Sequence, residues 1–146
     1  MYRDRSNQSG DVSEMTVYLD MIKRGWIVSL PSSRDAVYDM VVDMGEAGFQ
    51  TIQVKTMSNN SITKVIDRSG ERVSVNGKVR NSLDYAAHGI DWLAGVTKDG
   101  RIYYYKLETY RDIDTKSFSV NKNPPDEFPI NEVPSRHTVR QKNTDK

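Results

Sequence analysis

Three polar side chains interrupt two neighbouring apolar segments in the first half of the chain. Asp39 lies in the run Tyr38–Met44, and Gln53 and Lys55 lie in the next run, "QTIQVKTM". Carboxylate and amide oxygens are ligands for hard divalent cations, and an ammonium group beside them can orient water or stabilise negative charge. Polar groups on buried segments are costly unless they are paired or perform a function. The alternative is an ordinary cross-strand ion pair between Asp39 and Lys55.

The two segments are predicted to be adjacent strands that bring these side chains together. The sequence "GEAGF" between them is typical of the tight connection in an antiparallel hairpin. Side chains alternate between the two faces of a strand, so Gln53 and Lys55 share a face. Asp39 can join them across the hairpin.

A helix is predicted before the hairpin, from about Asp11 to Lys23. Apolar residues recur in it at helical spacing, namely Val12, Met15, Leu19 and Ile22. Asp11 is a suitable N-cap with Glu14 three residues later, as in a capping box, and "KRG" provides a stop signal. Glu14 can project onto the sheet and complete the polar cluster, or it can be a capping residue alone.

The rest of the chain predicts one mixed sheet followed by a tail. In chain order the pattern predicts a strand in "GWIVSLP", a strand pair in "SITKVIDRSGERVSVNGK", a short helix in "NSLDYAAHG" and a strand pair in "IDWLAGVTKDGRIYYYKLE". This order predicts an α+β or α/β fold with a central mixed β-sheet flanked by helices. Residues 1–9 are expected to be a flexible arm. Residues 121–146 are expected to be an extended or disordered tail, because their prolines and charges leave nothing to bury.

Composition excludes several classes of protein. Of the 146 residues, 36% are hydrophobic and 28% charged, which is typical of a folded domain, and the formal charge of +1 does not itself indicate a nucleic-acid partner. Without cysteine there is no disulfide or thiolate metal site. No apolar stretch approaches a membrane span and no hydrophobic signal core follows the start, so we expect an intracellular location. His88 and His137 are expected to have structural or solvent-exposed roles.

The order of these motifs resembles the PD-(D/E)xK nuclease superfamily, in which a carboxylate on one strand precedes (D/E/Q)xK on the next and a glutamate lies on the preceding helix. Within this superfamily, the sequence pattern "GWIVSLP…YDMVVD…IQVKT" is similar to that of the small group I intron homing endonucleases, where glutamine replaces the acidic residue before xK. The segment "IDWLAGVTKDGRIYYYKLE" is similar to that subgroup's closing segment. The resemblance covers about Gly10 to Glu108 and implies a restriction-endonuclease-like nuclease domain over residues 10–120.

The resemblance implies a metal-dependent DNA endonuclease that hydrolyses phosphodiester bonds. Mg²⁺, with Mn²⁺ as a substitute, is the implied cofactor, since oxygen ligands suit a hard cation. Its implied ligands are Glu14, Asp39, the amide oxygen of Gln53 and the backbone carbonyl of Val54. Lys55 is expected to orient or deprotonate the attacking water, or to stabilise charge in the transition state. A neutral ligand at Gln53 is expected to weaken metal binding.

Double-stranded DNA is the implied partner, and a hairpin at about residues 58–80 is expected to bind it. Side chains that can meet phosphates or base edges are Lys64, Arg68, Arg72, Lys78, Arg80, Asn59, Asn60 and Asn76. The alternative is a solvated basic face. Cutting both strands requires two sites, so a homodimer or homotetramer is implied, without a membrane or an organic cofactor. Two rival functions are a Holliday-junction resolvase-like nuclease and a non-catalytic DNA-binding protein, the latter favoured by Gln53.

Overall fold

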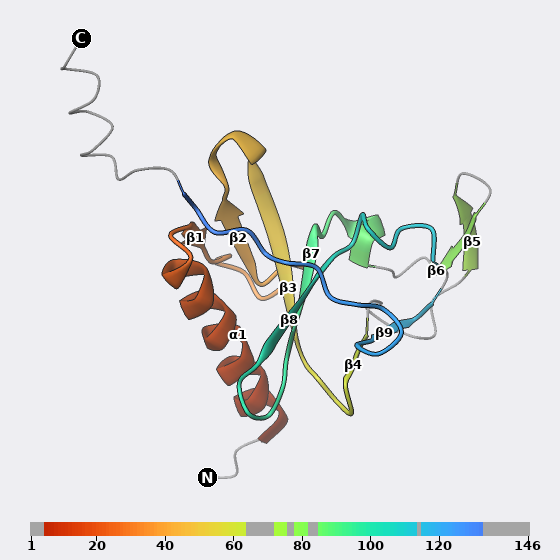
Figure 1. Ribbon diagram of the computed structural model, residues 1–146, viewed down its shortest axis with the longest axis horizontal. Helices are drawn as coiled ribbons and strands as arrows, with labels where there is room; N and C mark the ends of the chain where they lie inside the picture. The colour runs from red at the N-terminus through yellow and green to blue at the C-terminus, as the bar shows by residue number, and fades with distance from the viewer. Residues whose placement is uncertain (1–4, 64–71, 76–77, 82–84, 114, 133–146) are drawn as a thin grey trace, which may run out of the picture.

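In the computed structural model, one long helix packs on a five-stranded sheet (Figure 1). The structure describes residues 5–63, 72–75, 78–81, 85–113 and 115–132. The helix is α1 (Arg5–Lys23). The sheet contains, in spatial order, β1 (Ile27–Ser29), β2 (Met40–Asp43), β3 (Phe49–Thr56), β7 (Trp92–Val96) and β8 (Ile102–Lys106). The predicted α+β class with a mixed sheet is confirmed.

The sheet is mixed because β3 and β7 run parallel while its other neighbouring strands are antiparallel. The short helix η1 (Gly45–Ala47) connects β2 to β3, and this hairpin was predicted correctly. The predicted β7–β8 pair and a short helix before it, η2 (Tyr85–His88), are also present. Asp91 joins the parallel strands at one end, where its carboxylate accepts a hydrogen bond of 2.9 Å from the Thr51 N–H.

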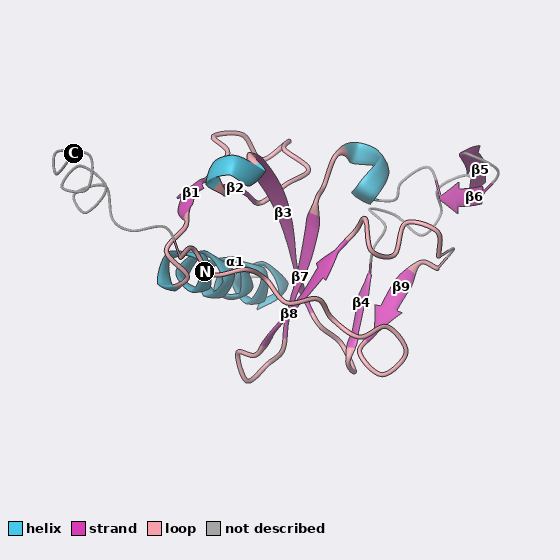
Figure 2. Cartoon of the chain, turned by 45° about the horizontal axis from the view of Figure 1, so that its top comes forward, coloured by secondary structure: helices cyan, strands magenta, loops and turns pink. Residues whose placement is uncertain are grey.

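The two faces of the sheet bury separate clusters of apolar side chains. One cluster lies between the sheet and α1 and includes Val17, Met21 and Ile52. The other lies on the opposite face and includes Leu93, Tyr105 and Phe118. Figure 2 shows α1 on one side of the sheet and the pair of β4 (Ser61–Thr63) with β9 (Ser117–Ser119) on the other. The expectation of helices flanking the sheet is therefore only partly met, since α1 is the one α-helix among the described residues.

The start and the buried face of α1 differ from the prediction. The helix begins at Arg5, six residues before Asp11, so Asp11 is an interior residue and the predicted capping box is wrong. The apolar residues whose spacing indicated the helix are all exposed, namely Val12, Met15, Leu19 and Ile22. The helix instead buries Ser13, Val17 and Met21 against the sheet. The 3.6-residue period was detected correctly, but it belongs to the outer face of the helix.

The strand pair predicted in residues 61–78 is also wrong. β4 pairs with β9, a strand that the sequence pattern did not indicate, rather than with β5 (Arg72–Val75). β5 pairs with β6 (Lys78–Asn81) as a separate two-stranded ribbon. The predicted turn at Arg68–Gly70 lies outside the described residues. A local pattern of alternating residues predicts strands but not which distant strand completes the pairing.

Residues 124–132, which we term the strap, return across the sheet to the end of α1. The strap is extended, as expected, but the expectation that it buries nothing is wrong. The Phe128 side chain is only 3% exposed, and its ring lies 4.5 Å from the centroid of Trp92 and 4.9 Å from that of Tyr104. Asp126 pairs with Tyr104 in an isolated antiparallel bridge. The strap is thus part of the first apolar cluster.

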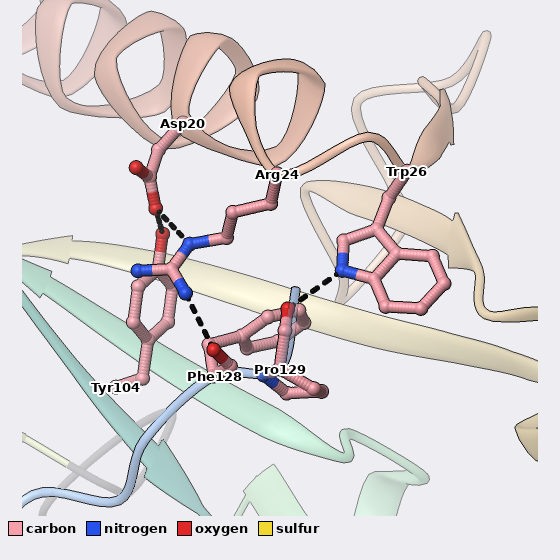
Figure 3. Close-up of polar contacts among 6 residues, drawn as sticks. All are labelled: Asp20, Arg24, Trp26, Tyr104, Phe128 and Pro129. Carbon is pink, nitrogen blue, oxygen red and sulfur yellow. Dashed lines mark hydrogen bonds and ion pairs between the residues drawn. The ribbon is translucent and has the colours of Figure 1, made fainter. Parts of the chain in front are cut away.

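Polar contacts hold the strap to the C-terminal end of α1 (Figure 3). The Arg24 guanidinium donates to the Phe128 carbonyl and also to Asp20, and the Asp20 carboxylate accepts a hydrogen bond of 2.6 Å from the Tyr104 hydroxyl. The Trp26 indole donates to the Pro129 carbonyl over 2.8 Å. These bonds satisfy polar groups beside the buried ring of Phe128, so helix, sheet and strap form one unit. Residues 133–146 lie outside the described part of the chain.

Candidate functional site

Asp39 lies at the point where β2 begins, opposite Gln53 of β3. The register pairs Met40 with Ile52, and the Asp39 N–H donates to the Ile52 carbonyl over 2.8 Å. One carboxylate oxygen of Asp39 accepts a hydrogen bond of 2.7 Å from the Val54 N–H. The hairpin therefore fixes both the backbone and the side chain of Asp39 against the strand that carries the predicted amide and ammonium groups.

Glu14 reaches Asp39 from α1, and the two side chains share a hydrogen bond. Burial is the largest cause of a rise in the pKa of Glu14 to about 7, and the charge of Asp39 raises it further. Burial also raises the pKa of Asp39, although the Val54 N–H, the bond from Glu14 and the charge of Lys55 oppose that rise. Two carboxylates can share a hydrogen bond only when one of them is protonated, and a pKa of about 7 lets Glu14 keep its proton up to nearly neutral pH. When Glu14 loses this proton, two negative charges lie side by side.

Gln53 holds a buried acceptor without a partner. Its Oε1 atom is fully buried and accepts no hydrogen bond among the described residues, while its Nε2 donates over 3.5 Å to the Val54 carbonyl. A buried polar atom left unpaired costs about 1–3 kcal/mol. The N–H and C=O of one strand residue point toward the same neighbouring strand, so the Val54 carbonyl faces the side on which Asp39 lies. The Val54 carbonyl and the Gln53 amide therefore belong to the part of β3 that the Asp39 carboxylate contacts.

Lys55 lies on the face of β3 that Gln53 shares, over an aromatic ring. Its Nζ atom is 5.1 Å from the centroid of Tyr85, a residue of η2 that is 3% exposed. The predicted alternative was a cross-strand ion pair of Lys55 with Asp39. Within the described part of the chain, the ion pairs lie elsewhere, joining Arg24 to Asp20 and Arg101 to Asp99. The ammonium is oriented by the ring and remains available to an anion.

A cavity of about 620 Å³ opens beside the two carboxylates. Its walls are the N-terminal half of α1, with Asp11 and Glu14, and the loop between β1 and β2, with Arg34 and Tyr38. Asp39 also lines it. The carboxylates are therefore reachable from solvent, and the exposed Arg34 supplies a cation at the mouth.

Two residues of this site were missed in the sequence. Ser13 is 4% exposed, and its hydroxyl lies 2.8 Å from that of Thr56, the residue after Lys55. Because Ser13 precedes Glu14, this contact fixes the position of Glu14 along β3. Arg34 lies in the polar turn "SSRDA", five residues before Asp39. Its position just upstream of the candidate carboxylate was the available signal, whereas Ser13 could be found only from the tertiary contact.

The structure describes only part of the predicted DNA-reading hairpin. Asn59 and Asn60 form an exposed turn directly after β3, with positive φ values of 51° and 61° that asparagine tolerates better than most residues. The turn is closed by two backbone bonds between Ser58 and Ser61. Three of the named basic residues, Arg72, Lys78 and Arg80, lie on the β5–β6 ribbon. Predicted contacts that lie outside the described residues are Lys64, Arg68 and Asn76.

Comparison with known protein families identifies the family of this chain. Residues 5–124 match the family model described as PD-(D/E)XK endonuclease. The chain belongs to the PD-(D/E)XK endonuclease family. It is also similar in structure to a bacterial homing endonuclease, I-Ssp6803I, with a TM-score of 0.58, 14% sequence identity and 98% of each chain covered. No curated protein matches it in sequence.

Membership identifies the chemistry in outline. A PD-(D/E)XK endonuclease is a phosphodiester hydrolase that acts on DNA, and members of the family typically use a divalent metal. The resemblance inferred from the motifs is confirmed, and so is the restriction-endonuclease-like fold. Among the residues of this endonuclease that the structure describes, no helix has the length and apolar character needed to cross a membrane.

The donor set of the endonuclease suits a hard cation with oxygen ligands. No group of three or more His, Asp or Glu side chains that could hold a metal occurs in the described residues, so an all-carboxylate cage is absent there. Glu14 and Asp39 instead supply two carboxylates, beside the unpaired Oε1 of Gln53 and the Val54 carbonyl. A cation bound here would relieve the repulsion between the carboxylates and satisfy the orphaned amide. The residues present therefore fit a divalent metal.

Proposed function

We propose that this chain is a metal-dependent, site-specific double-strand DNA endonuclease of the homing type. Glu14, Asp39, Gln53 and Lys55 form its active site. The observation that supports it best is the contact of Glu14 from α1 with Asp39, whose carboxylate also accepts a hydrogen bond from β3, the strand that carries the unpaired buried amide oxygen of Gln53. This arrangement costs stability in the absence of a ligand, so a purely structural role does not explain it.

Each side chain has a role that follows from its surroundings. Glu14, Asp39, Gln53 and the Val54 carbonyl would hold Mg²⁺ or Mn²⁺, which supplies an activated water and neutralises charge on the scissile phosphate. The Val54 N–H holds the Asp39 carboxylate in one orientation. Lys55, held over the Tyr85 ring, orients the attacking water and stabilises the negative charge that grows on the phosphate.

The cavity beside the site leaves room for a DNA backbone. Arg34 at its mouth is proposed to contact a phosphate next to the scissile one, since guanidinium groups bind phosphate oxygens in a fixed, bidentate geometry. Asn59 and Asn60, together with the β5–β6 ribbon, are proposed to contact the neighbouring bases and phosphates. Cutting both strands of a duplex requires two such sites, so the active form is a homodimer or homotetramer.

Cleavage of a plasmid and genomic library in magnesium tests the proposal. The wild type should cut at one or a few defined places. Asp39→Asn and Lys55→Met should lower the cleavage rate by at least about 100-fold with DNA binding retained. Matched controls are Glu46→Gln in η1 and Lys98→Met in the turn between β7 and β8, which alter exposed charges outside the site and should leave cleavage unchanged. EDTA should abolish cleavage by the wild type.

Three results would refute parts of the proposal. Cutting of four-way junctions without cutting of linear or supercoiled duplexes would indicate a resolvase-like enzyme instead. DNA binding without cutting of any substrate, in magnesium or manganese, would indicate a binding protein that retains the nuclease fold. Equal activity of Asp39→Asn and Glu46→Gln would remove the assigned carboxylate from the active site.

A further inference from the structure

The outer face of α1 carries a straight row of exposed apolar side chains, which we term the outer stripe. Its members, with exposed fractions of 66%, 57%, 50% and 46%, are Val12, Met15, Leu19 and Ile22. Their spacing of three, four and three residues places them on one side of the helix. At about 100° per residue, the stripe points about 180° away from the buried side chains of α1. Figure 1 shows α1 at an outer side of the molecule, with the sheet on its inner side.

The size of the outer stripe indicates an interaction surface. Together the four side chains expose an area on the order of 400 Å², which is within the range of patches that mark binding sites on soluble proteins. An isolated exposed apolar residue is common and needs no explanation. Four in register along one helix have the pattern of a helix that packs against another helix on its outer side.

We infer that the outer stripe is the interface between two copies of this chain, packed with their α1 helices antiparallel. The spacing is symmetric about Val17, so a two-fold axis through this point makes the stripe complementary to itself. Val12 then faces Ile22 of the partner subunit, and Met15 faces Leu19 of the partner subunit. A small side chain thus meets a larger one at each end, and two long ones meet in the middle.

The charges at the ends of the stripe favour the antiparallel arrangement. Asp11 lies at its N-terminal end and Lys23 in the last turn of the helix. Asp11 and Lys23 lie on opposite flanks of the stripe, so antiparallel packing places the acidic end of one helix alongside the basic end of the other without a direct ion pair, whereas parallel packing places like charges alongside each other. The two helix dipoles also oppose each other in the antiparallel pair.

This pairing has a consequence for the active sites, which rests on the proposed function. Glu14 lies about 120° around α1 from the outer stripe, on the flank that lines the cavity. The two-fold axis of an antiparallel pair is perpendicular to both helices. It relates the flank that carries Glu14 in one copy to the same flank in the partner, and both flanks face the same side of the helix pair. Both copies therefore open their cavities on the same side of the dimer, where one duplex can reach both sites.

The buried area sets the expected strength of the dimer. Pairing two stripes removes on the order of 800 Å² from solvent, whereas specific interfaces usually bury at least about 1,200 Å². The flanking Asp11, Tyr18 and Lys23 supply further contact area. We therefore expect a dissociation constant on the order of micromolar in the absence of DNA.

Sedimentation equilibrium at protein concentrations up to about 100 µM, without DNA or metal, tests the interface. The wild type should be a dimer at the upper end of this range. Leu19→Glu should raise the dissociation constant by at least about 100-fold, because it places two charges in the centre of the interface. Phe49→Glu is the matched control, since Phe49 is 75% exposed on β3 and lies off the stripe. A monomeric wild type, or a dimer that Leu19→Glu leaves intact, would overturn the inference.

Disulfide cross-linking tests the orientation, and the chain has no natural cysteine to interfere. Met15→Cys and Leu19→Cys are prepared separately, one with a larger tag so that mixed dimers run at their own position. The mixture should give mainly the mixed product. Cross-links of each variant only with itself would indicate parallel helices, and no cross-link would overturn the interface. Neither experiment depends on DNA cleavage, so failure of the nuclease proposal would leave both results interpretable.

Discussion

The unpaired amide of Gln53 provides the sharpest test of the site, because two substitutions there should change stability in opposite directions. Gln53→Met keeps the length of the side chain and removes the orphaned acceptor. Gln53→Glu replaces it with a third carboxylate next to Glu14 and Asp39, whose pKa values are already raised. The fully buried Oε1 accepts no hydrogen bond among the described residues, and the bond from Nε2 is at the limiting length of 3.5 Å.

The magnitudes follow from what each change does in the metal-free protein. Relief of one unsatisfied buried acceptor should raise the free energy of unfolding of Gln53→Met by about 1–3 kcal/mol. An uncompensated carboxylate in the same place should lower the free energy of unfolding of Gln53→Glu by about 3–5 kcal/mol. Magnesium should reverse this loss, because a third carboxylate strengthens a site for a hard cation.

Urea unfolding in EDTA and in magnesium measures both effects. We expect the order of stability in EDTA to be Gln53→Met, wild type, Gln53→Glu. In magnesium the gain in stability should be largest for Gln53→Glu and smallest for Gln53→Met. If Gln53→Met is less stable than the wild type in EDTA, the amide has a structural partner and the reasoning is wrong. If magnesium stabilises all three proteins equally, the metal binds elsewhere.

Three further predictions concern the fold and its pH dependence. Phe128→Ala should lower the free energy of unfolding, measured in urea, by about 3–5 kcal/mol. Ile130→Ala, at a position that is 64% exposed, should change it by less than about 0.5 kcal/mol. Equal effects of the two substitutions would show that the strap is not part of the core. Without metal, stability should fall as the pH rises from 4.5 to about 7, because the folded protein holds the Glu14 proton more tightly than the unfolded chain does. Thermal melts in EDTA should show this slope reduced in Glu14→Gln, and an unchanged slope would assign it to another group. Gly95→Ala should cost about 1–3 kcal/mol in urea unfolding, because an added Cβ would lie 2.8 Å from the Met57 Cγ, and a neutral result would show that Met57 moves freely.

The candidate site was largely predictable because its members lie close together in the sequence. Asp39, Gln53 and Lys55 belong to one hairpin, and a hairpin with a short connection fixes which residues face each other. The alternation of side chains along β3 then determines the face that Gln53 and Lys55 share. Local geometry alone therefore brought three of the four proposed site residues together.

The position of Glu14 required the tertiary structure. Its contact with Asp39 depends on where α1 crosses the sheet, which the buried Ser13, Val17 and Met21 determine. The helical period in the sequence came from the opposite, exposed face. A periodic row of apolar residues indicates that a helix has a face to bury. It does not indicate whether that face packs against the protein's own sheet or against another chain.

The sequence by itself determined most of the elements, though not β9 or the start of α1, and the hairpin of the site, since periodicity and turn chemistry act over a few residues. The tertiary structure alone decided the parallel pairing of β3 with β7, the pairing of β4 with β9 and the burial of Phe128 in the strap. These contacts join residues that are far apart along the chain. Whether they form depends on the sum of buried area over the whole molecule against the entropy of closing long loops, which no local pattern encodes.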